Sequence, residues 1–265
     1  MSNITNKSTQ IFRAIRIIFH IISGLLQSAI YPYISKPSQK RMSKNWSTGL
    51  LSILSIKLRF SGTPPVNQSQ PIMLVANHIS WLDIYALMTI CPSRFVAKAE
   101  IRNWPLLGWL SKNVGTLFIE RTRNSDIVRI NQDISHALTS GDLVAIFPEG
   151  TTSDGTTVKK FHASLLQSAV KTKASICPVA IRYHDTSGKI SKAAAYVGVS
   201  LLESLKTILK QPWIEVELIF SDPIKTNEHN RQELARTSQK VITNMLSPQI
   251  SLHKVPEKFS GLPNE

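Results

Sequence analysis

The chain has 265 residues, a formal net charge of +14 at pH 7 and two cysteines. This length suits one α/β domain with an additional N-terminal element, and two cysteines exclude a disulfide framework. The first 82 residues contain nine Lys or Arg and neither Asp nor Glu. A basic, apolar N-terminal region favours membrane lipids as a partner. The basic residues are scattered and match no nucleic-acid-binding motif, so we expect no nucleic acid partner.

An apolar helix is predicted for residues 11–30, which are enough to span a bilayer. Polar side chains interrupt it at intervals of three and four residues, at Arg13, Arg16, His20, Ser23 and Gln27. A spanning helix would place these charges in lipid, whereas a helix lying in the interface can turn the polar stripe toward the headgroups. The polar stripe argues against a signal peptide, and a helix buried on the globular domain stays an alternative.

A second amphipathic helix is predicted for residues 42–60. With the first helix it forms a predicted two-helix membrane-docking element over residues 1–62. The aromatic side chains of Tyr31, Tyr33 and Trp46 are expected at the level of the headgroups. The basic charge predicts that this element lies at the cytoplasmic face of the inner membrane, embedded in it or lying on it.

The remaining sequence alternates apolar segments of strand length with segments of helix length. Strands are predicted at residues 72–76, 94–98, 115–119, 142–147, 176–182, 193–199 and 213–220. Helices are predicted at residues 81–91, 105–112, 125–139, 162–172, 201–209 and 229–246. This alternation predicts an α/β domain over residues 63–248, with a mixed sheet covered by helices. Pro178 marks its strand as an edge or a bulge, and the tail at 249–265 is expected to be loosely ordered.

The segment 77–83 follows a predicted strand and reads Asn-His-Ile-Ser-Trp-Leu-Asp. His78 and Asp83 cannot pair inside one helix, because five helical residues turn through about 500°. They can pair if His78 lies in the turn before the helix and Asp83 in its first turn, where Ser80 and Asp83 fit a capping box. His78 would then be a general base oriented by a carboxylate. The alternative is a helix cap beside an ordinary turn histidine.

Three further segments accompany this motif. Residues 115–121 read Gly-Thr-Leu-Phe-Ile-Glu-Arg, residues 145–152 read Ala-Ile-Phe-Pro-Glu-Gly-Thr-Thr, and residues 176–181 read Ile-Cys-Pro-Val-Ala-Ile. In this order the four segments resemble the glycerolipid acyltransferase family, typified by 1-acylglycerol-3-phosphate acyltransferase. The family's first motif is Asn-His-x-Ser-x-x-Asp, and each of its fixed positions is present here.

The resemblance implies an enzyme of phospholipid biosynthesis. It would move a fatty acyl chain from acyl-CoA or acyl carrier protein to the sn-2 hydroxyl of lysophosphatidate and so form phosphatidate. His78 would take the proton from the lipid hydroxyl, and Asp83 would orient and stabilise the imidazole, as the acid does in a Ser-His-Asp triad. The substrate hydroxyl replaces the serine, so no covalent acyl-enzyme is required.

Residues that match the other family motifs would bind the acceptor. Arg121 would contact its phosphate, and Gly115 would permit close backbone approach. The acceptor site would be shaped by three consecutive residues, Glu149, Gly150 and Thr151. Asn77 would either orient the turn or donate to the developing oxyanion, and the sequence leaves both roles open.

Two positions depart from the family pattern. Thr152 stands where the family has arginine, and His162 stands where it often has lysine, although Lys159 and Lys160 are nearby. This variant resembles family branches that acylate other bacterial lysolipids, including lyso-ornithine lipid, which is therefore the alternative acceptor.

Other classes of function stay open. An acyl-thioester hydrolase would use water at the same His78–Asp83 pair, and a non-catalytic membrane-surface protein would use only the basic N-terminus. The residues predict no metal site and no cofactor besides the acyl donor. Cys91 and Cys177 are predicted to be buried structural thiols. The sequence does not indicate an oligomeric state.

Overall fold

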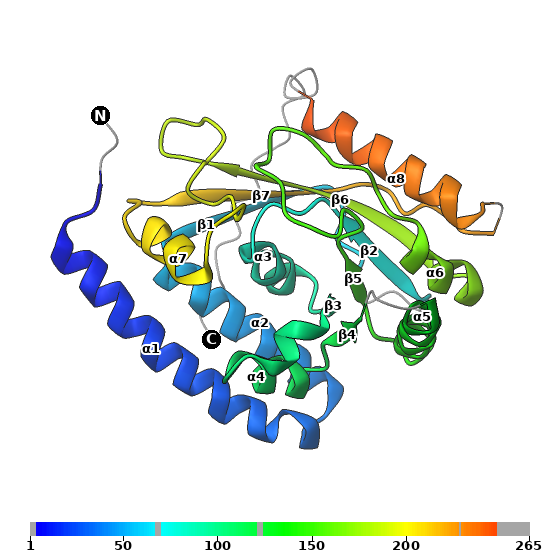
Figure 1. Cartoon of the computed structure of the whole chain (residues 1–265), viewed down its shortest axis with the longest axis horizontal. Helices are drawn as coiled ribbons and strands as arrows, with labels where there is room; N and C mark the ends of the chain where they lie inside the picture. Colours follow the sequence, from blue (N-terminus) through cyan, green and yellow to red (C-terminus); the bar gives the residue numbers. More distant parts are fainter. Residues whose placement is uncertain (1–3, 67–69, 121–123, 228, 248–265) are drawn as a thin grey trace.

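The computed structural model describes residues 4–66, 70–120, 124–227 and 229–247 (Figure 1). Within these residues the strands are β1 Ile56–Ser61, β2 Ile72–Ala76, β3 Arg94–Lys98, β4 Leu117–Ile119, β5 Val144–Ile146, β6 Ser175–His184 and β7 Ile214–Phe220. The α-helices are α1 Lys7–Ile30, α2 Lys36–Ile53, α3 Leu82–Ile90, α4 Leu107–Asn113, α5 Asn124–Thr139, α6 Gln167–Thr172, α7 Leu201–Leu209 and α8 Arg231–Leu246. Short 3₁₀ helices cover Tyr31–Tyr33, Ala99–Asn103 and Ser164–Leu166.

The strands form one mixed sheet in the order β1-β7-β6-β2-β5-β3-β4. Neighbouring strands are parallel except for β6 and β7, which are antiparallel. The predicted fold class is confirmed. Because β2, β3, β4 and β5 run in one direction, their carboxyl ends share one edge of the sheet, which is where α/β folds place their sites.

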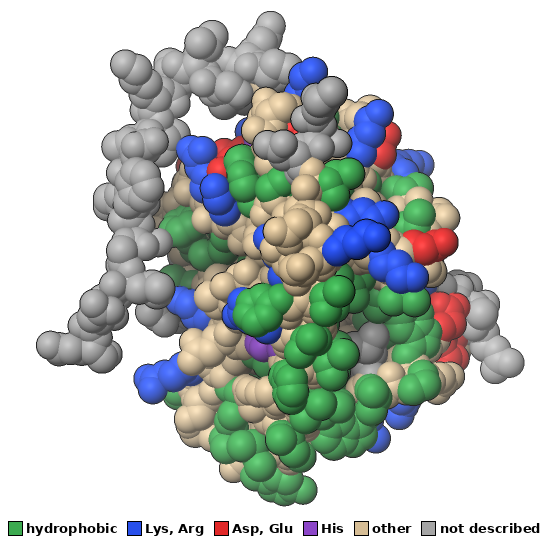
Figure 2. Space-filling model, turned by 90° about the vertical axis from the view of Figure 1, so that its left-hand side faces the viewer, with side chains coloured by type: hydrophobic (Ala, Val, Ile, Leu, Met, Phe, Trp, Pro, Cys, Tyr) green, Lys and Arg blue, Asp and Glu red, His purple; other side chains and the backbone are tan. Residues whose placement is uncertain are grey.

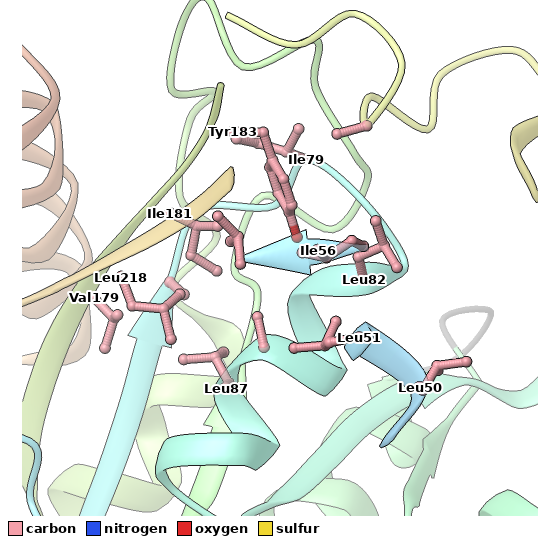
Figure 3. Close-up of a cluster of buried hydrophobic side chains, with 14 of the residues drawn as sticks. Leu50, Leu51, Ile56, Ile79, Leu82, Leu87, Val179, Ile181, Tyr183 and Leu218 are labelled. Carbon is pink, nitrogen blue, oxygen red and sulfur yellow. The ribbon is translucent and has the colours of Figure 1, made fainter. Parts of the chain in front are cut away.

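Helices cover both faces of the sheet and form two hydrophobic cores. One core joins α2, α3 and α7 to the sheet. Figure 3 shows part of this core, with Leu87 of α3 on the side of Val179 and Leu218 of the strands and Leu82 of α3 on the side of Ile56 of β1. The other core joins α5, α6 and α8 to the opposite face. Both faces of β2 are therefore covered, which explains why all five of its residues are apolar and buried.

The predicted second docking helix at 42–60 is wrong in its last third. The helix α2 ends at Ile53, and after Ser55, with a φ of 55°, the chain continues as strand β1. Residues 56–61 alternate apolar and polar side chains, which is the period of a strand, and they pair in parallel with β7. The predicted domain boundary at residue 62 is wrong for the same reason, because β1 belongs to the sheet of the α/β domain. Residues 249–265 lie outside the described residues.

Most of the polar stripe of α1 faces the protein, whereas Arg16 is exposed and lies over the ring of Phe12. Arg13 donates to the carbonyls of Gln211 and Pro212, and the ring of His20 stacks on Trp46, with centroids 4.6 Å apart. Trp46 also donates to the carbonyl of His20, so its predicted place among the headgroups is wrong. These contacts satisfy the polar groups on the inner side of α1.

The outer side of α1 is apolar. Large exposed side chains on it are Ile11, Phe12, Ile15, Ile18, Phe19, Ile22, Leu26 and Ile30. Figure 2, which looks onto the side of the molecule that carries α1, shows hydrophobic side chains gathered over its lower half. The segment Lys7–Tyr33 is long and apolar enough to cross a membrane by length and composition. Such a large exposed apolar surface is typical of a membrane or protein contact.

One predicted strand is wrong, and of the two alternatives for Pro178, an edge strand or a bulge, the edge is excluded. Residues 193–199 form turns and bends, with Val197 and Val199 exposed, because this segment pairs with no strand of the sheet. Strand β6 is not at an edge, because it lies between β7 and β2. On the side facing β7 the pairing shifts by one residue at Pro178, because Ile176 bridges to Ile224 whereas Val179 pairs with Phe220. Such a bulge is a position in a sheet where proline is tolerated.

Candidate active site

His78 lies in the turn between β2 and α3, at the carboxyl edge of the sheet. Its Nδ1 is 2.8 Å from Oδ2 of Asp83. The side chain of Asp83 is completely buried, whereas that of His78 is 19% exposed. Since Nδ1 is engaged with the carboxylate, Nε2 is the nitrogen left to meet a substrate, and it has no hydrogen-bond partner among the described residues. The structure therefore brings the two predicted catalytic residues together.

Asp83 accepts hydrogen bonds from four different groups. Besides His78, the backbone N–H groups of Ile79 and Ser80 donate to its Oδ2, at 2.7 and 3.0 Å. The hydroxyl of Tyr183 donates to its Oδ1 at 2.7 Å. This network fixes the carboxylate on both oxygens, which a group that orients a base requires.

Only half of the predicted capping box forms. Asp83 accepts from the backbone of Ser80, but the Ser80 hydroxyl is buried and has no partner among the described residues. The backbone N–H of Asp83 instead donates to the Ser80 carbonyl at 3.1 Å, as in a tight turn. Trp81 takes the cap position of α3. The prediction of Ser80 as a side-chain cap is wrong, because the turn closes through the backbone.

Asn77 ties the turn to the neighbouring strand β6. Its side chain donates to the carbonyl of Ile181 at 2.9 Å and accepts from the N–H of the same residue at 2.7 Å. Asn77 is itself buried. Of the two roles left open by the sequence, these contacts support orientation of the turn.

Glu149 follows β5 and supports the turn from the other side. One of its carboxylate oxygens accepts from the backbone N–H of His78 at 2.8 Å, and the other accepts from that of Lys159 at 3.1 Å. Burial raises the pKa of Glu149, although the two N–H donors and the charges of His78 and Lys159 act in the opposite direction. Phe147, two residues earlier, stacks on the imidazole with ring centroids 4.1 Å apart and an angle of 11°.

The loop after Glu149 closes around the same turn. Gly150 adopts a φ of 72°, which favours glycine, and Thr151 is exposed. Ser153 donates its N–H to the carbonyl of His78 at 2.8 Å. The Thr152 hydroxyl donates to the carbonyl of Tyr196, in the segment at 193–199. The position that is arginine in the family pattern therefore makes an uncharged contact between two loops.

Gly115 lies near the amino ends of the parallel strands, whereas His78 lies at their carboxyl ends. Gly115 precedes β4, and it lines a cavity of about 270 Å³ together with Arg94 at the start of β3 and Asp142 just before β5. His78 follows the carboxyl end of β2, so the structure separates Gly115 from the predicted acceptor site. Arg121 lies outside the described residues.

Sequence reasoning missed Tyr183 and Phe147. Tyr183 lies near the carboxyl end of β6 and Phe147 directly follows β5, and a position at the carboxyl end of a strand was the available signal. Cys91 and Cys177 are buried, and burial raises the pKa of both thiols to about 12. They are inert structural thiols in this structure.

The acyltransferase family model matches residues 57–182. A lyso-ornithine lipid O-acyltransferase from Pseudomonas aeruginosa is 38% identical over 78% of this chain and 78% of its own length. A 1-acyl-sn-glycerol-3-phosphate acyltransferase from Neisseria meningitidis is 37% identical over 69% of this chain and 71% of its own length. The chain therefore belongs to the acyltransferase family.

Within this family, the chain is an acyltransferase of the lysophospholipid and glycerolipid type. Its two kinds of relatives are about equally similar to it. A crystal structure of the 1-acyl-sn-glycerophosphate acyltransferase from Thermotoga maritima matches with a TM-score of 0.63 and 18% identity, covering 88% of this chain and 96% of that one. At this identity the match supports the fold alone.

Proposed function

We propose that this protein transfers a fatty acyl chain from a thioester, acyl-CoA or acyl carrier protein, to the hydroxyl of a lysolipid. The observation that carries the proposal is the His78–Asp83 pair, with Nδ1 bound to a buried carboxylate and the ring partly exposed. This geometry suits a general base that works through Nε2.

The reaction needs no covalent intermediate on the protein. Nε2 of His78 takes the hydroxyl proton as the lipid oxygen attacks the thioester carbonyl carbon. The tetrahedral intermediate then expels the thiolate as the C–S bond breaks, and His78 returns the proton to the sulfur. The products are an ester and a free thiol. Asp83 stabilises the imidazolium that exists between the two proton transfers.

Lysophosphatidate is the first acceptor we propose, with acylation at the sn-2 hydroxyl and Arg121 as the phosphate ligand. Arginine suits a phosphate because its planar guanidinium can bind two oxygens at once. The second candidate is lyso-ornithine lipid. It is favoured by Thr152, which supplies a hydroxyl bound to the Tyr196 carbonyl where the family pattern has a cation.

Membrane association is part of the proposal. The outer side of α1 would lie in the bilayer interface, while its inner polar side chains stay bound to the protein. The excess of basic residues before Asp83 supports a location at the cytoplasmic face, where anionic lipids are concentrated.

The test is acyl transfer by the purified protein in detergent, from labelled acyl-CoA to lysophosphatidate and to lyso-ornithine lipid in parallel. We expect His78→Ala to lower transfer at least about 10²-fold, whereas His136→Ala, on the exposed surface of α5, should leave it unchanged. Near-normal transfer by His78→Ala would refute the mechanism. Release of free fatty acid without any acceptor product would instead support a thioester hydrolase.

A further inference from the structure

Strand β6 holds both ends of the segment 77–83. At one end, Asn77 is bound through its side chain to the backbone of Ile181. At the other end, Asp83 is bound through Oδ1 to the hydroxyl of Tyr183, two residues farther along the same strand. Figure 3 shows Tyr183 pointing from the sheet toward the first turn of α3, near Leu82.

From these contacts we propose that Tyr183 is a positioning residue for the catalytic base, acting through Asp83. This inference rests on the proposed general-base mechanism. The other three donors to Asp83, including the His78 ring, all reach Oδ2. Tyr183 is the donor to Oδ1 among the described residues, so its hydroxyl is what prevents the carboxylate from rotating away from the imidazole.

The surroundings of Tyr183 suit this role. Its side chain is 1% exposed, so water does not replace it as the donor. Burial, and the charge and hydrogen bond of Asp83, raise the pKa of Tyr183 well above its ordinary value. The phenol therefore stays protonated and donates throughout the pH range in which an imidazole base works.

Tyr183 also limits how strongly Asp83 stabilises a protonated imidazole. Each donor to the carboxylate withdraws negative charge from it, so removal of the hydroxyl leaves more charge facing His78. Among the described residues, hydrogen bonds place two other ionisable residues beside His78: Glu149, which accepts from the backbone of His78, and Lys159, which donates its backbone N–H to Glu149. Neither contacts Tyr183, so the substitution leaves both in place.

The experiment compares Tyr183→Phe with Tyr85→Phe. Tyr85 is a matched control because it lies on α3, packs its ring against Trp46 and Trp81, and has no hydrogen bond to Asp83. For Tyr183→Phe we expect kcat to fall about 10-fold or more with KM for the acceptor changed less than about twofold. The acid limb of the pH dependence of kcat/KM should move to higher pH. Tyr85→Phe should change neither quantity.

Unchanged kcat and an unmoved acid limb in Tyr183→Phe would overturn the proposal, as would equal effects of the two substitutions. Wild-type protein provides a readout that requires no folded variant. In its NMR spectrum the Tyr183 hydroxyl proton should exchange slowly with water, and fast exchange would also overturn the proposal. This readout needs no acceptor, so it separates failure of the positioning role from failure of the proposed function.

Discussion

The carboxylate of Glu149 accepts the backbone N–H of His78 although the two residues are 71 positions apart in the chain. This bond joins the turn after β2 to the turn after β5, and β2 and β5 are neighbours in the sheet. The residue that fits the family's acceptor motif is therefore also part of the support of the base. A change at Glu149 should affect the rate constant as well as the binding of the acceptor.

Glu149→Gln tests this double role. An amide has one oxygen, so it can accept from the N–H of His78 or from that of Lys159 but leaves the other, partly buried N–H facing its NH₂ group. We expect a loss of about 1–3 kcal/mol in the free energy of unfolding and a lower kcat. Denaturant unfolding and steady-state kinetics measure the two effects. Glu100→Gln, at an exposed position, is the control, and equal stability of both variants would contradict the assignment.

Asp83→Asn separates the charge of the carboxylate from its hydrogen bonds. The amide oxygen can still accept from Ile79 and Ser80, and its NH₂ group can donate to the Tyr183 hydroxyl. We therefore expect the fold to persist while kcat falls about 10²–10⁴-fold, because an uncharged partner stabilises the imidazolium poorly. Circular dichroism and kinetics check both parts. A variant with near-normal kcat would mean that the Asp83 charge is dispensable.

The outer side of α1 should bind membranes through its apolar side chains. Phe19 and Leu26 are 67% and 69% exposed, so their replacement by glutamine costs the isolated fold little. We expect each replacement to weaken binding to anionic lipid vesicles about 10-fold or more, from the transfer energy of a large apolar side chain. Co-sedimentation measures this, with Val128→Gln on α5 as the control for loss of an exposed apolar group. Unchanged binding of the α1 variants would exclude this face as the membrane contact.

Arg121→Ala tests the acceptor. If the guanidinium binds the phosphate, KM for lysophosphatidate should rise about 10-fold or more, because a charge-assisted, bidentate contact is lost. Transfer to lyso-ornithine lipid should change little. Arg123→Ala, two positions along the chain, is the control for loss of positive charge. An equal loss with both acceptors would argue against a phosphate ligand at Arg121.

Much of the fold could be predicted from the sequence because buried strands such as β2 are uniformly apolar and the helices between them are amphipathic. The strand β1 was missed although its six residues alternate apolar and polar side chains, because only Leu54 and Ser55 separate it from α2 and neither Gly nor Pro marks the boundary. The side of α1 that faces the protein could not be predicted from the sequence either. Its polar stripe fits headgroups and backbone carbonyls equally well, and only the positions of Gln211 and Pro212 decide between them.

The site was predictable where one short segment contains both partners, as with His78 and Asp83. Residues that act across the sheet were not, because the pairing of β6 with β2 brings Tyr183 to Asp83 from 100 positions away. Gly115 is the opposite case, because it was predicted to lie in the site and the structure places it away from His78. Its motif suggests proximity to the other motifs, but the residue stands at the amino end of its strand and so at the far edge of the sheet.

The pairing of β1 with β7 determines when the sheet can be completed during synthesis. Ile56 pairs with Ile214, so the strand that follows the two N-terminal helices finds its partner only when most of the chain has been synthesised. Helix α1 emerges first, with its apolar side uncovered, and can reach a membrane before the sheet is complete. The last strand to arrive, β7, lies between β1 and β6, and β6 carries Tyr183. The sheet beside the strand that carries Tyr183 is therefore complete only after β7 has been synthesised, long after α1.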